Sequence, residues 1–331
     1  MLLQCLKETL PKNLKSFIRL ALDYINDFRL YIKYSTVFSA KSFENKESIL
    51  ILHYHGVEKG LLHEKIKPKF AKNRIKIMHT LLCDIEIINK INESQIFIGY
   101  KIAIEYYNFH KKLEIDISDY FTESQYLEYL NLTNAIGNYD FISGVKKLSF
   151  NKFYADQTNF YQFSHSRKSI RSFTGEKIKF GTIKKVIELS NNAPSVCNRQ
   201  ASRVYLIEDK QKINECLKIQ DGFNGFSENV SQLLILTTDR SYFYSTGERN
   251  QLYIDGGIYL LNLLYALHFY KIAACPANWG KDFTQDSKVR KVIKVPESEQ
   301  IICMIPIGIA QEEISFTLSY RRTVDEVLKT L

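Results

Sequence analysis

Apolar side chains recur at intervals of three and four residues through the first 150 positions, which is the spacing of one helix face. The clearest case is residues 13–34, whose apolar positions are Phe17, Leu20, Leu22, Ile25, Phe28 and Ile32. The polar side of this segment carries Lys15, Arg19, Arg29 and Lys33. The pattern predicts a helix that packs against the protein; a basic helix lying on a membrane surface is the alternative.

Three further segments of the first half show the same spacing. They predict helices over residues 72–91, 94–113 and 124–136. Glycine and proline, which disfavour helices, are scarce in this half. Residues 1–150 are therefore predicted to form a helical N-terminal domain.

The pattern changes near residue 150. Residues 149–167 are aromatic and polar without a clear period, which is typical of a connector. After them, predicted helices at 180–193 and 252–270 alternate with strand-like runs at 203–208, 232–238 and 300–310. Residues 151–331 are therefore predicted to form a second domain of α+β or α/β class.

Composition and charge limit the possible functions. The 331 residues are 45% apolar and 24% charged, which is ordinary for a globular protein. The net charge of +9 is spread over both halves, so it favours an anionic ligand weakly and gives no concentrated basic stripe for nucleic acid. No uncharged apolar run reaches ~18 residues, so no membrane span is predicted.

Cysteine usage and the N-terminal residues bear on localisation. The six cysteines are scattered and form no CxxC pair, which favours reduced thiols in the cytoplasm. The first residues show no apolar run followed by a small-residue cleavage site, so no signal peptide is predicted.

The stretch SRKSIRSF, residues 166–173, is the first candidate for chemistry. In extended conformation Arg167, Ser169 and Arg171 would share one face. Two guanidinium groups and a hydroxyl suit a phosphate or a carboxylate. Taken alone, the stretch is more typical of a solvated loop with a serine N-cap.

A second candidate is the polar loop within residues 191–208. A helix is predicted to stop before Pro194, because the residue ahead of a proline avoids helical angles. Ser195, Asn198 and Gln200 follow before a strand begins. Short polar side chains in such a loop suit the edge of a planar heterocycle, although a simple turn is the alternative.

These two stretches, in this order and spacing, resemble the flavin-dependent nitroreductase superfamily. The family pattern has R-x-S-x-[RK]-x-F, then a helix, then A-P-S-x-x-N-x-Q-P; here Ala201 replaces the last proline. The C-terminal SYRRTVDEV, residues 319–327, is similar to the closing family motif, with Thr323 in place of a proline. Residues 248–280 are similar to the long central helix and to the turn that passes over the flavin.

The resemblance covers roughly residues 164–330 and implies a fold. It implies an α+β, nitroreductase-like three-layer fold with a central mixed or antiparallel sheet, preceded here by the helical N-terminal domain. Some family members carry a helical extension containing a stretch like HGVEKGLL, residues 55–62. The resemblance also implies a homodimer with two sites at the subunit interface.

The resemblance further implies which residues bind FMN. Arg167, Lys168 and Ser169 would lie at the phosphate and ribityl chain, Arg171 nearer the pyrimidine edge, and Arg321 at the phosphate from the C-terminus. Other candidates would reach the ring: Pro194, Ser195, Val196, Asn198 and Gln200 from the partner subunit, Pro276, Ala277 and Asn278 near N5, and Asn224 by a looser match. No protein nucleophile, catalytic base or metal is expected, because the chemistry is on the flavin.

The implied activity is oxidoreduction of a small-molecule substrate. NAD(P)H would reduce FMN by hydride transfer, and the flavin would reduce an electron-poor acceptor such as a nitro compound, a quinone or a biosynthetic intermediate. Two alternatives stay open. One is a flavin-dependent dehydrogenase or a ferredoxin-fed reductase; the other is a non-catalytic flavin-binding protein.

Several other signals are given structural interpretations. His53, His55, Glu58 and His63 could form a metal site, but His-x-His with one carboxylate is a weak pattern, and a structural or pocket-lining role is favoured. Cys197 and Cys275 could form a redox pair, although small residues lining a pocket are the default expectation. Gly256 and Gly257 lack the context of a dinucleotide fold, so close helix packing is expected there.

Overall fold

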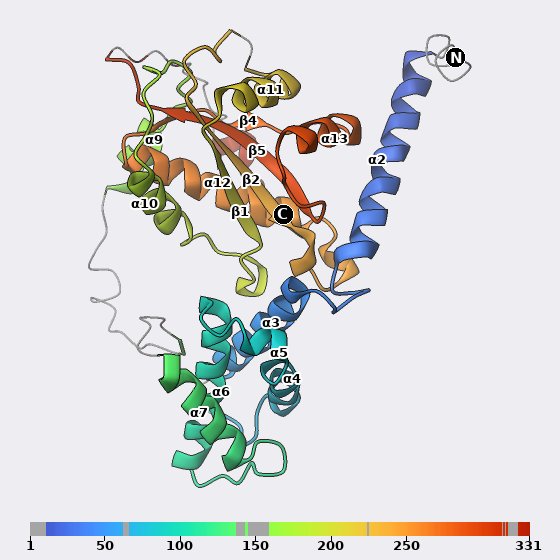
Figure 1. Ribbon diagram of the computed structural model, residues 1–331, viewed down its shortest axis with the longest axis vertical. Helices are drawn as coiled ribbons and strands as arrows, with labels where there is room; N and C mark the ends of the chain where they lie inside the picture. Colours follow the sequence, from blue (N-terminus) through green and yellow to red (C-terminus); the bar gives the residue numbers. More distant parts are fainter. Residues whose placement is uncertain are drawn as a thin grey trace.

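A computed structural model describes residues 11–61, 66–136, 143–144, 159–223, 225–312, 314, 316 and 324–331 (Figure 1). The first half contains α2 Lys12–Tyr34, α3 Phe43–Leu61, α4 Lys72–Leu82, α5 Ile85–Ile88, α6 Ser94–Lys112 and α7 Glu123–Ile136. The second half begins with α9 Phe160–Ser166, α10 Phe180–Ser190, η1 Val196–Asn198, β1 Ser202–Ile207, α11 Lys210–Gln220, β2 Gln232–Asp239, η2 Arg240–Tyr242 and η3 Thr246–Glu248. It continues with α12 Gln251–Phe269, β3 Ala273–Ala274, β4 Ala277–Asn278, α13 Phe283–Val292, β5 Glu299–Gly308 and α14 Val324–Val327.

The second half is a three-layer α+β structure, as predicted. Its sheet has the order β1-β2-β5-β3, with β4 also paired to β5, and every described strand pair is antiparallel. Along β2, Leu233 and Ile235 pack into a core with α11 and α13. Leu234 packs into the opposite core with α10 and α12. Helices thus cover both faces, which is why all of β2 is buried.

One predicted helix is wrong in its extent. Residues 72–91 form two helices, α4 and α5, because the chain leaves helical geometry at Asp84. The Asp84 carboxylate accepts a hydrogen bond from the Glu86 backbone N–H and so caps α5 at its N-terminus. The predicted connector also contains a helix, α9, and the predicted domain boundary at residue 150 lies outside the described residues.

The helical half is joined to the second half by a shared core and by buried hydrogen bonds. Tyr242 and Phe243 belong to the same hydrophobic cluster as the side chains of α3, α4 and α6. Asn45 Nδ2 donates to the Ser241 carbonyl at 2.8 Å, and Ser48 Oγ donates to the Tyr242 carbonyl at 2.9 Å. The helical half therefore packs directly on the segment that follows β2.

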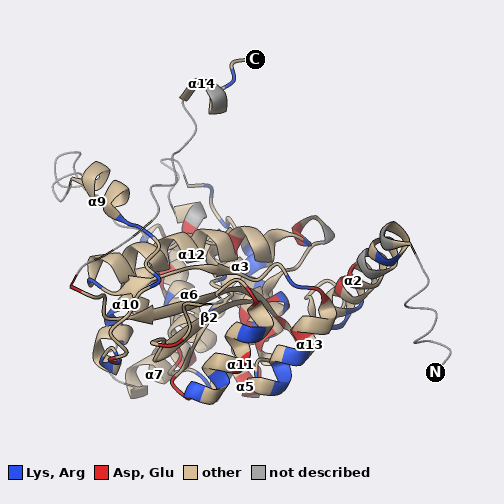
Figure 2. Cartoon of the chain, turned by 90° about the horizontal axis from the view of Figure 1, so that it is seen from above, with Lys and Arg blue, Asp and Glu red and all other residues tan. Residues whose placement is uncertain are grey.

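Helix α2 packs on its own chain with its polar side. Arg29 and Lys33 each lie 2.6 Å from the Glu297 carboxylate, and Asp23 accepts from the Phe283 backbone N–H at 2.9 Å. Figure 2 shows α2 projecting from the rest of the chain. Its apolar stripe is solvent-exposed and consists of Leu14, Phe17, Ile18, Ile25, Phe28 and Ile32. The predicted helix exists, but its apolar face has no cover within the described chain.

Two membrane expectations have different outcomes. No helix among the described residues is both long enough and apolar enough to cross a bilayer. The alternative that α2 lies on a membrane surface is not tested by this finding and stays open.

We predict that Glu297→Gln loosens α2. The hydrogen bonds from Lys33, Tyr34 and Arg29 hold the pKa of Glu297 at about 2, so the carboxylate is ionised in the docked state. Because the pair is well exposed, the loss should be modest, with amide exchange in α2 about two- to five-fold faster at pH 7 by hydrogen–deuterium exchange. The matched control is Glu312→Gln, at an exposed acid elsewhere.

The same pKa shift fixes the sign of a pH effect. A carboxyl group with a depressed folded-state pKa contributes stability that is present above its usual value of 4.5 and is lost as the pH falls toward about 2. Wild-type α2 should therefore become more sensitive to pepsin over that range, whereas the Glu297→Gln variant should change less. Equal sensitivity of the two proteins at every pH would contradict the assigned role.

Candidate functional site

A cavity of about 390 Å³ lies between the 166–170 segment, the C-terminal end of α12, β3 and the chain after β5. We call it the cationic cavity. It is lined by Ser166, Arg167, Lys168, Ile170, Leu264, His268, Lys271, Ile272, Ala273, Ala274, Ala310, Ile314 and Phe316. None of these described residues is an acid, so the described lining combines three permanent cations and a histidine.

The 166–173 segment is held in place by the backbone and by Phe173. The Ile170 N–H donates to the Ala274 carbonyl at 2.9 Å, which joins the segment to β3. Phe173 is buried and packs against Gly308 at the end of β5. This anchoring brings Arg167 and Lys168 to the cavity.

The structure does not show the simple alternation of side chains that an extended 166–173 segment would have. Arg167, Lys168 and Ile170 line the cavity, whereas Ser169 and Arg171 are not among its lining residues. Arg171 nevertheless lies close enough to Cys275 to oppose, together with Arg167, the rise in the pKa of that thiol that burial causes. The first motif and the 273–278 segment are therefore brought together.

The 273–280 segment carries the third group of predicted residues. Pro276 is half-buried, Ala277 is buried in β4, and Asn278 has an exposed side chain while its carbonyl accepts from Gln220 Nε2 at 2.9 Å. Trp279 is buried and donates from its indole N–H to Asp286 at 3.2 Å, so it fills the core.

The 191–203 loop carries the second group of predicted residues and is tethered at both sides. The Asp255 carboxylate of α12 accepts from the Val196 N–H at 3.2 Å. The buried Arg199 guanidinium pairs with Glu248 at 2.6 Å. Burial raises the pKa of Asp255, and the bonds from Gln251 and Val196 oppose that rise.

The backbone of this loop is unusual. Cys197, Asn198 and Gln200 all have left-handed φ angles, at 49°, 57° and 52°. Residues other than glycine rarely adopt this backbone conformation, and strain of this kind is typical of functional loops.

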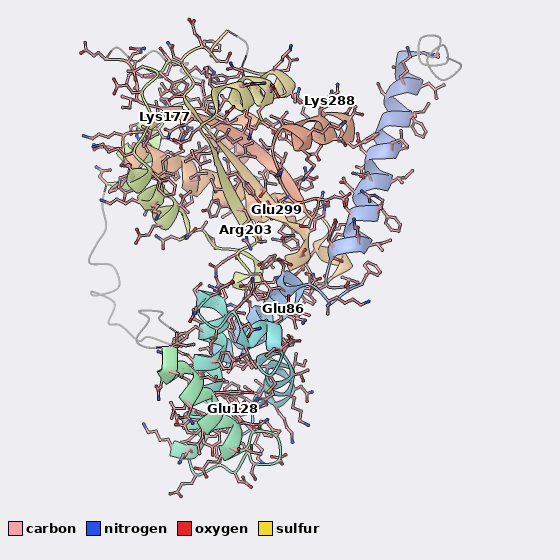
Figure 3. All side chains as sticks on the ribbon, in the orientation of Figure 1. Glu86, Glu128, Lys177, Arg203, Lys288 and Glu299 are labelled. Carbon is pink, nitrogen blue, oxygen red and sulfur yellow. The ribbon has the colours of Figure 1, made fainter. Side chains whose placement is uncertain are left out.

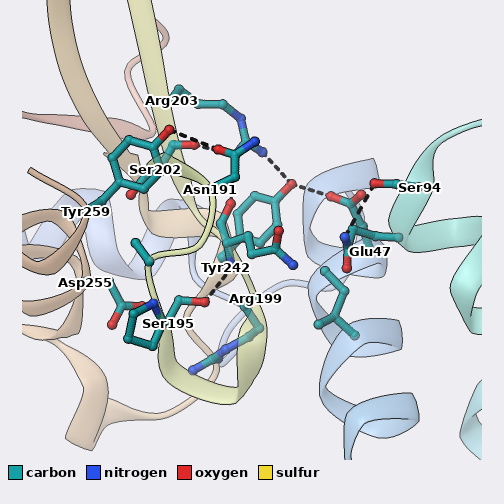
Figure 4. A pocket seen from close by; sticks show the side chains of 15 residues that line it. Glu47, Ser94, Asn191, Ser195, Arg199, Ser202, Arg203, Tyr242, Asp255 and Tyr259 are labelled. Carbon is teal, nitrogen blue, oxygen red and sulfur yellow. Dashed lines mark hydrogen bonds between the residues drawn. The ribbon is translucent and has the colours of Figure 1, made fainter. Parts of the chain in front are cut away.

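A second cavity, of about 240 Å³, lies where this loop meets the helical half (Figure 4). We call it the junction pocket. From the second half it is lined by Asn191, Ala193, Pro194, Ser195, Arg199, Gln200, Ser202, Arg203, Tyr242, Asp255 and Tyr259; from the helical half it is lined by Glu47, Ile51, Ser94 and Gln95. Most of these side chains are polar, and both halves of the chain contribute to the pocket.

A hydrogen-bonded chain runs along one side of the junction pocket. Arg203 Nη2 donates to the Tyr242 hydroxyl at 2.8 Å, and that hydroxyl donates to the Glu47 carboxylate. Burial raises the pKa of Glu47, and the bond from Tyr242 opposes the rise. Figure 3 places Arg203 at the end of the sheet nearest the helical half.

The cationic cavity and the 194–198 loop lie at opposite ends of α12. Asp255 near its start holds Val196, and His268 near its end faces Ser166 at 2.6 Å. Thirteen residues of helix separate these positions, or about 20 Å at 1.5 Å per residue. A single copy of the chain therefore does not bring all the predicted FMN-binding residues to one place.

Close packing explains Gly256 but not Gly257 of the pair in α12. A Cβ atom on Gly256 would lie 2.7 Å from Ile302 Cγ1, so this position lets the helix approach the sheet. A Cβ atom on Gly257 would meet nothing within 4 Å, because this residue is on the outer face. That face also exposes Ile254, Ile258 and Leu261.

Other predicted sites have definite outcomes. His55 pairs with Glu58 at 3.1 Å, and the described residues contain no cluster of three or more potential metal ligands. Cys197 and Cys275 are free thiols. Asn224 and Arg321, which the resemblance assigns to FMN, lie outside the described residues, as does His63.

Several residues at these cavities were not predicted from the sequence. His268 and Lys271 line the cationic cavity, and Glu47, Gln95 and Tyr242 line the junction pocket. The helical spacing places His268 and Leu264 on one face of α12, but no motif marks either residue as functional. Only the tertiary packing brings the residues of α3 and α6 to the loop.

Residues 165–221 match the family model described as Nitroreductase family. This match confirms the resemblance over the segment that carries the first two motifs. Comparison with the curated proteins gives no match.

Solved structures of similar proteins include three whose names are informative. A putative NADH dehydrogenase/NAD(P)H nitroreductase from Parabacteroides distasonis is 18% identical, with a TM-score of 0.46. The match covers 52% of this chain and 98% of the chain in that structure. An FMN-dependent nitroreductase from Clostridium difficile is 18% identical, with a TM-score of 0.43. The match covers 51% of this chain and 96% of the chain in that structure. A putative nitroreductase in complex with FMN from Desulfovibrio desulfuricans is 21% identical, with a TM-score of 0.44, and the coverage is 53% and 98%.

We predict that Arg199→Met destabilises the second half by about 3 kcal/mol, because it leaves the largely buried Glu248 carboxylate without its charged partner. Chemical denaturation followed by circular dichroism measures the loss. Adding Glu248→Gln to this variant should restore part of the stability. Simple additivity of the two single changes would show that the pair does not anchor the loop.

Proposed function

We propose that the second half of the chain binds FMN and that the protein is an FMN-dependent oxidoreductase. The observation that carries this proposal is the cationic cavity, which lies beside the segment that matches the Nitroreductase family. Its Arg167, Lys168 and Lys271 form no ion pair with a described carboxylate, whereas Lys46 and Arg290 each do. Gathered cations without compensation suit a dianionic phosphate.

In this proposal the residues of one copy hold the tail and one face of the flavin. Arg167 and Lys168 bind the phosphate, and Ser169 and Arg321 are predicted to assist. Arg171 lies near the pyrimidine edge, where a cation stabilises negative charge on the ring. The backbone of Pro276, Ala277 and Asn278 lies beside the ring, and Asn224 is a further predicted contact.

When bound, FMN supplies two-electron chemistry by accepting and giving a hydride at its ring. NAD(P)H is the proposed donor, and an electron-poor small molecule is the proposed acceptor. The polar junction pocket favours an acceptor with hydrogen-bonding groups over a purely apolar one. Protein side chains bind and orient the reactants in this scheme, and none acts as a nucleophile.

We further propose that a second copy completes the site. The 194–200 loop of one copy, with Pro194, Ser195, Val196, Asn198 and Gln200, would meet the flavin held by the other. Two features support this: the 20 Å separation within one copy, and the exposed apolar stripe of Ile254, Ile258 and Leu261 on α12. A stripe of this kind suits a two-fold helix contact.

We predict that the purified protein is yellow and that excess NADH or NADPH bleaches it without oxygen. Replacing Arg167 and Lys168 together by Ala should weaken FMN binding at least 100-fold, because two charge-assisted contacts are lost. Titration of flavin fluorescence measures the affinity, and Lys184→Ala with Lys185→Ala on α10 is the matched control.

The outcomes separate the competing interpretations. A bound flavin that neither nicotinamide reduces favours the dehydrogenase or ferredoxin-fed alternative. A flavin that no small donor reduces favours a binding protein. A wild-type protein that binds no flavin would contradict the proposal.

We predict that Leu261→Asp yields a monomer that also loses its flavin, because the charge disrupts the contact that completes the site. Light scattering coupled to chromatography gives the mass, and absorbance at flavin wavelengths gives the occupancy. The control is Leu127→Asp, at a similarly exposed leucine on α7. A dimer unaffected by Leu261→Asp would show that the interface lies elsewhere.

A further inference from the structure

The cationic cavity contains a lysine that belongs to neither sequence motif. Helix α12 ends at Phe269, and Lys271 is the second residue beyond it. Lys271 is exposed and lines the cavity, as do His268 from the last turn of the helix and residues of the 166–170 segment. The cavity is therefore bounded by cations from two distant parts of the sequence.

The backbone at Lys271 is left-handed, with φ +57°. Its N–H donates to the His268 carbonyl at 3.0 Å, and the next N–H, of Ile272, donates to the Leu267 carbonyl at 2.9 Å. Helices commonly close in this way, and glycine is the residue usually found at the left-handed position. A lysine in this conformation strains the backbone more than a glycine would. The positive charge that Lys271 brings to the cavity is therefore the feature that offsets this cost.

The charge balance around Lys271 shows what it faces. Among the described residues, the other ionisable groups lining the cavity are Arg167, Lys168 and His268, and none of the described lining residues is an acid. The His268 imidazole lies 2.6 Å from Ser166 Oγ, and burial and the nearby Arg167 lower its pKa. The carbonyl end of α12 carries partial negative charge, which stabilises a cation but repels a free anion.

We propose that Lys271 binds the terminal phosphate of the flavin nucleotide, opposite Arg167, and that it makes the site selective for FMN over riboflavin. Lys271 follows the end of α12 and lines the cavity, so its positive charge would offset the repulsion that the helix end exerts on a phosphate monoester. His268 positions Ser166 beside Arg167. This inference rests on the proposed function, because it assigns one more ligand to the same cofactor.

The test compares two flavins that differ only in the phosphate. Dissociation constants for FMN and riboflavin are measured by fluorescence quenching on the full chain, for wild type and Lys271→Met. Loss of one charge-assisted contact should weaken FMN binding about 10- to 100-fold while riboflavin binding is unchanged. Lys271→Arg should keep most of the selectivity, and Lys288→Met, at an exposed lysine on α13 (Figure 3), should match wild type.

A second variant separates binding from folding. Lys271→Gly removes the charge but relieves the left-handed backbone, so it should raise the melting temperature of the flavin-free chain while weakening FMN binding. Opposite movements of these two readouts cannot come from misfolding.

Three results would overturn the assignment. Unchanged FMN affinity in Lys271→Met would exclude a phosphate contact. Equal weakening of FMN and riboflavin would show that Lys271 only shapes the cavity. Binding of neither flavin by wild type would remove the proposed function and this inference together, whereas the first two outcomes leave the proposed function intact.

Discussion

The close packing of α12 on the sheet is the constraint on which both candidate cavities depend. Gly256 lets the helix approach β2 and β5, and Leu263 and Leu267 fill the core beneath it. A helix packed on the sheet cannot shorten or bend without exposing this core, so Asp255 and His268 keep a separation of about 20 Å. Asp255 at one end holds the 191–203 loop, and His268 at the other borders the cationic cavity.

The two cavities differ in how the charges of their arginines and lysines are balanced. In the junction pocket, Arg203 is balanced by Glu47 through Tyr242, and Arg199 is balanced by Glu248. Both arginines of the loop are therefore balanced by acids on other elements of the chain without a ligand. In the cationic cavity none of the lining residues that the structure describes is an acid, so the like charges of Arg167, Lys168 and Lys271 would repel one another less once an anion enters. A bound phosphate would therefore stabilise the fold as well as occupy the site.

Periodicity predicted the long elements because their faces are set by local spacing. Helices α2, α6, α7 and α12 and strands β1, β2 and β5 all lie close to their predicted ranges. The break at Asp84 was missed because a side-chain cap outweighs a continuing apolar pattern. Alternation alone did not place Lys168 at the cavity, although the family resemblance did, because the Ile170–Ala274 hydrogen bond, a tertiary contact, holds that segment.

The site was predictable only where its residues share a sequence motif. Arg167 and Ser195 belong to short patterns, whereas Lys271 occupies a position where glycine is the expected residue and so carries no signal of its own. Glu47 and Gln95 lie on helices whose spacing gives the packing face but not the identity of the surface they meet. Such residues become visible only when two separately predictable parts of the chain are docked.

The packing of the helical half on the second half also bears on why a helical half accompanies a nitroreductase-like fold. Asn45 and Ser48 of α3 bind the backbone of residues 241–242, and the adjacent Glu47 receives the Tyr242 hydroxyl bond. The same helix therefore fixes the segment after β2 and supplies an acid to the junction pocket. Because the 194–200 loop lines that pocket, any molecule bound there would contact both the helical half and the loop proposed to reach a neighbouring flavin. In the proposed function the helical half would therefore help to select the acceptor, while the cations at the far end of α12 would select the cofactor.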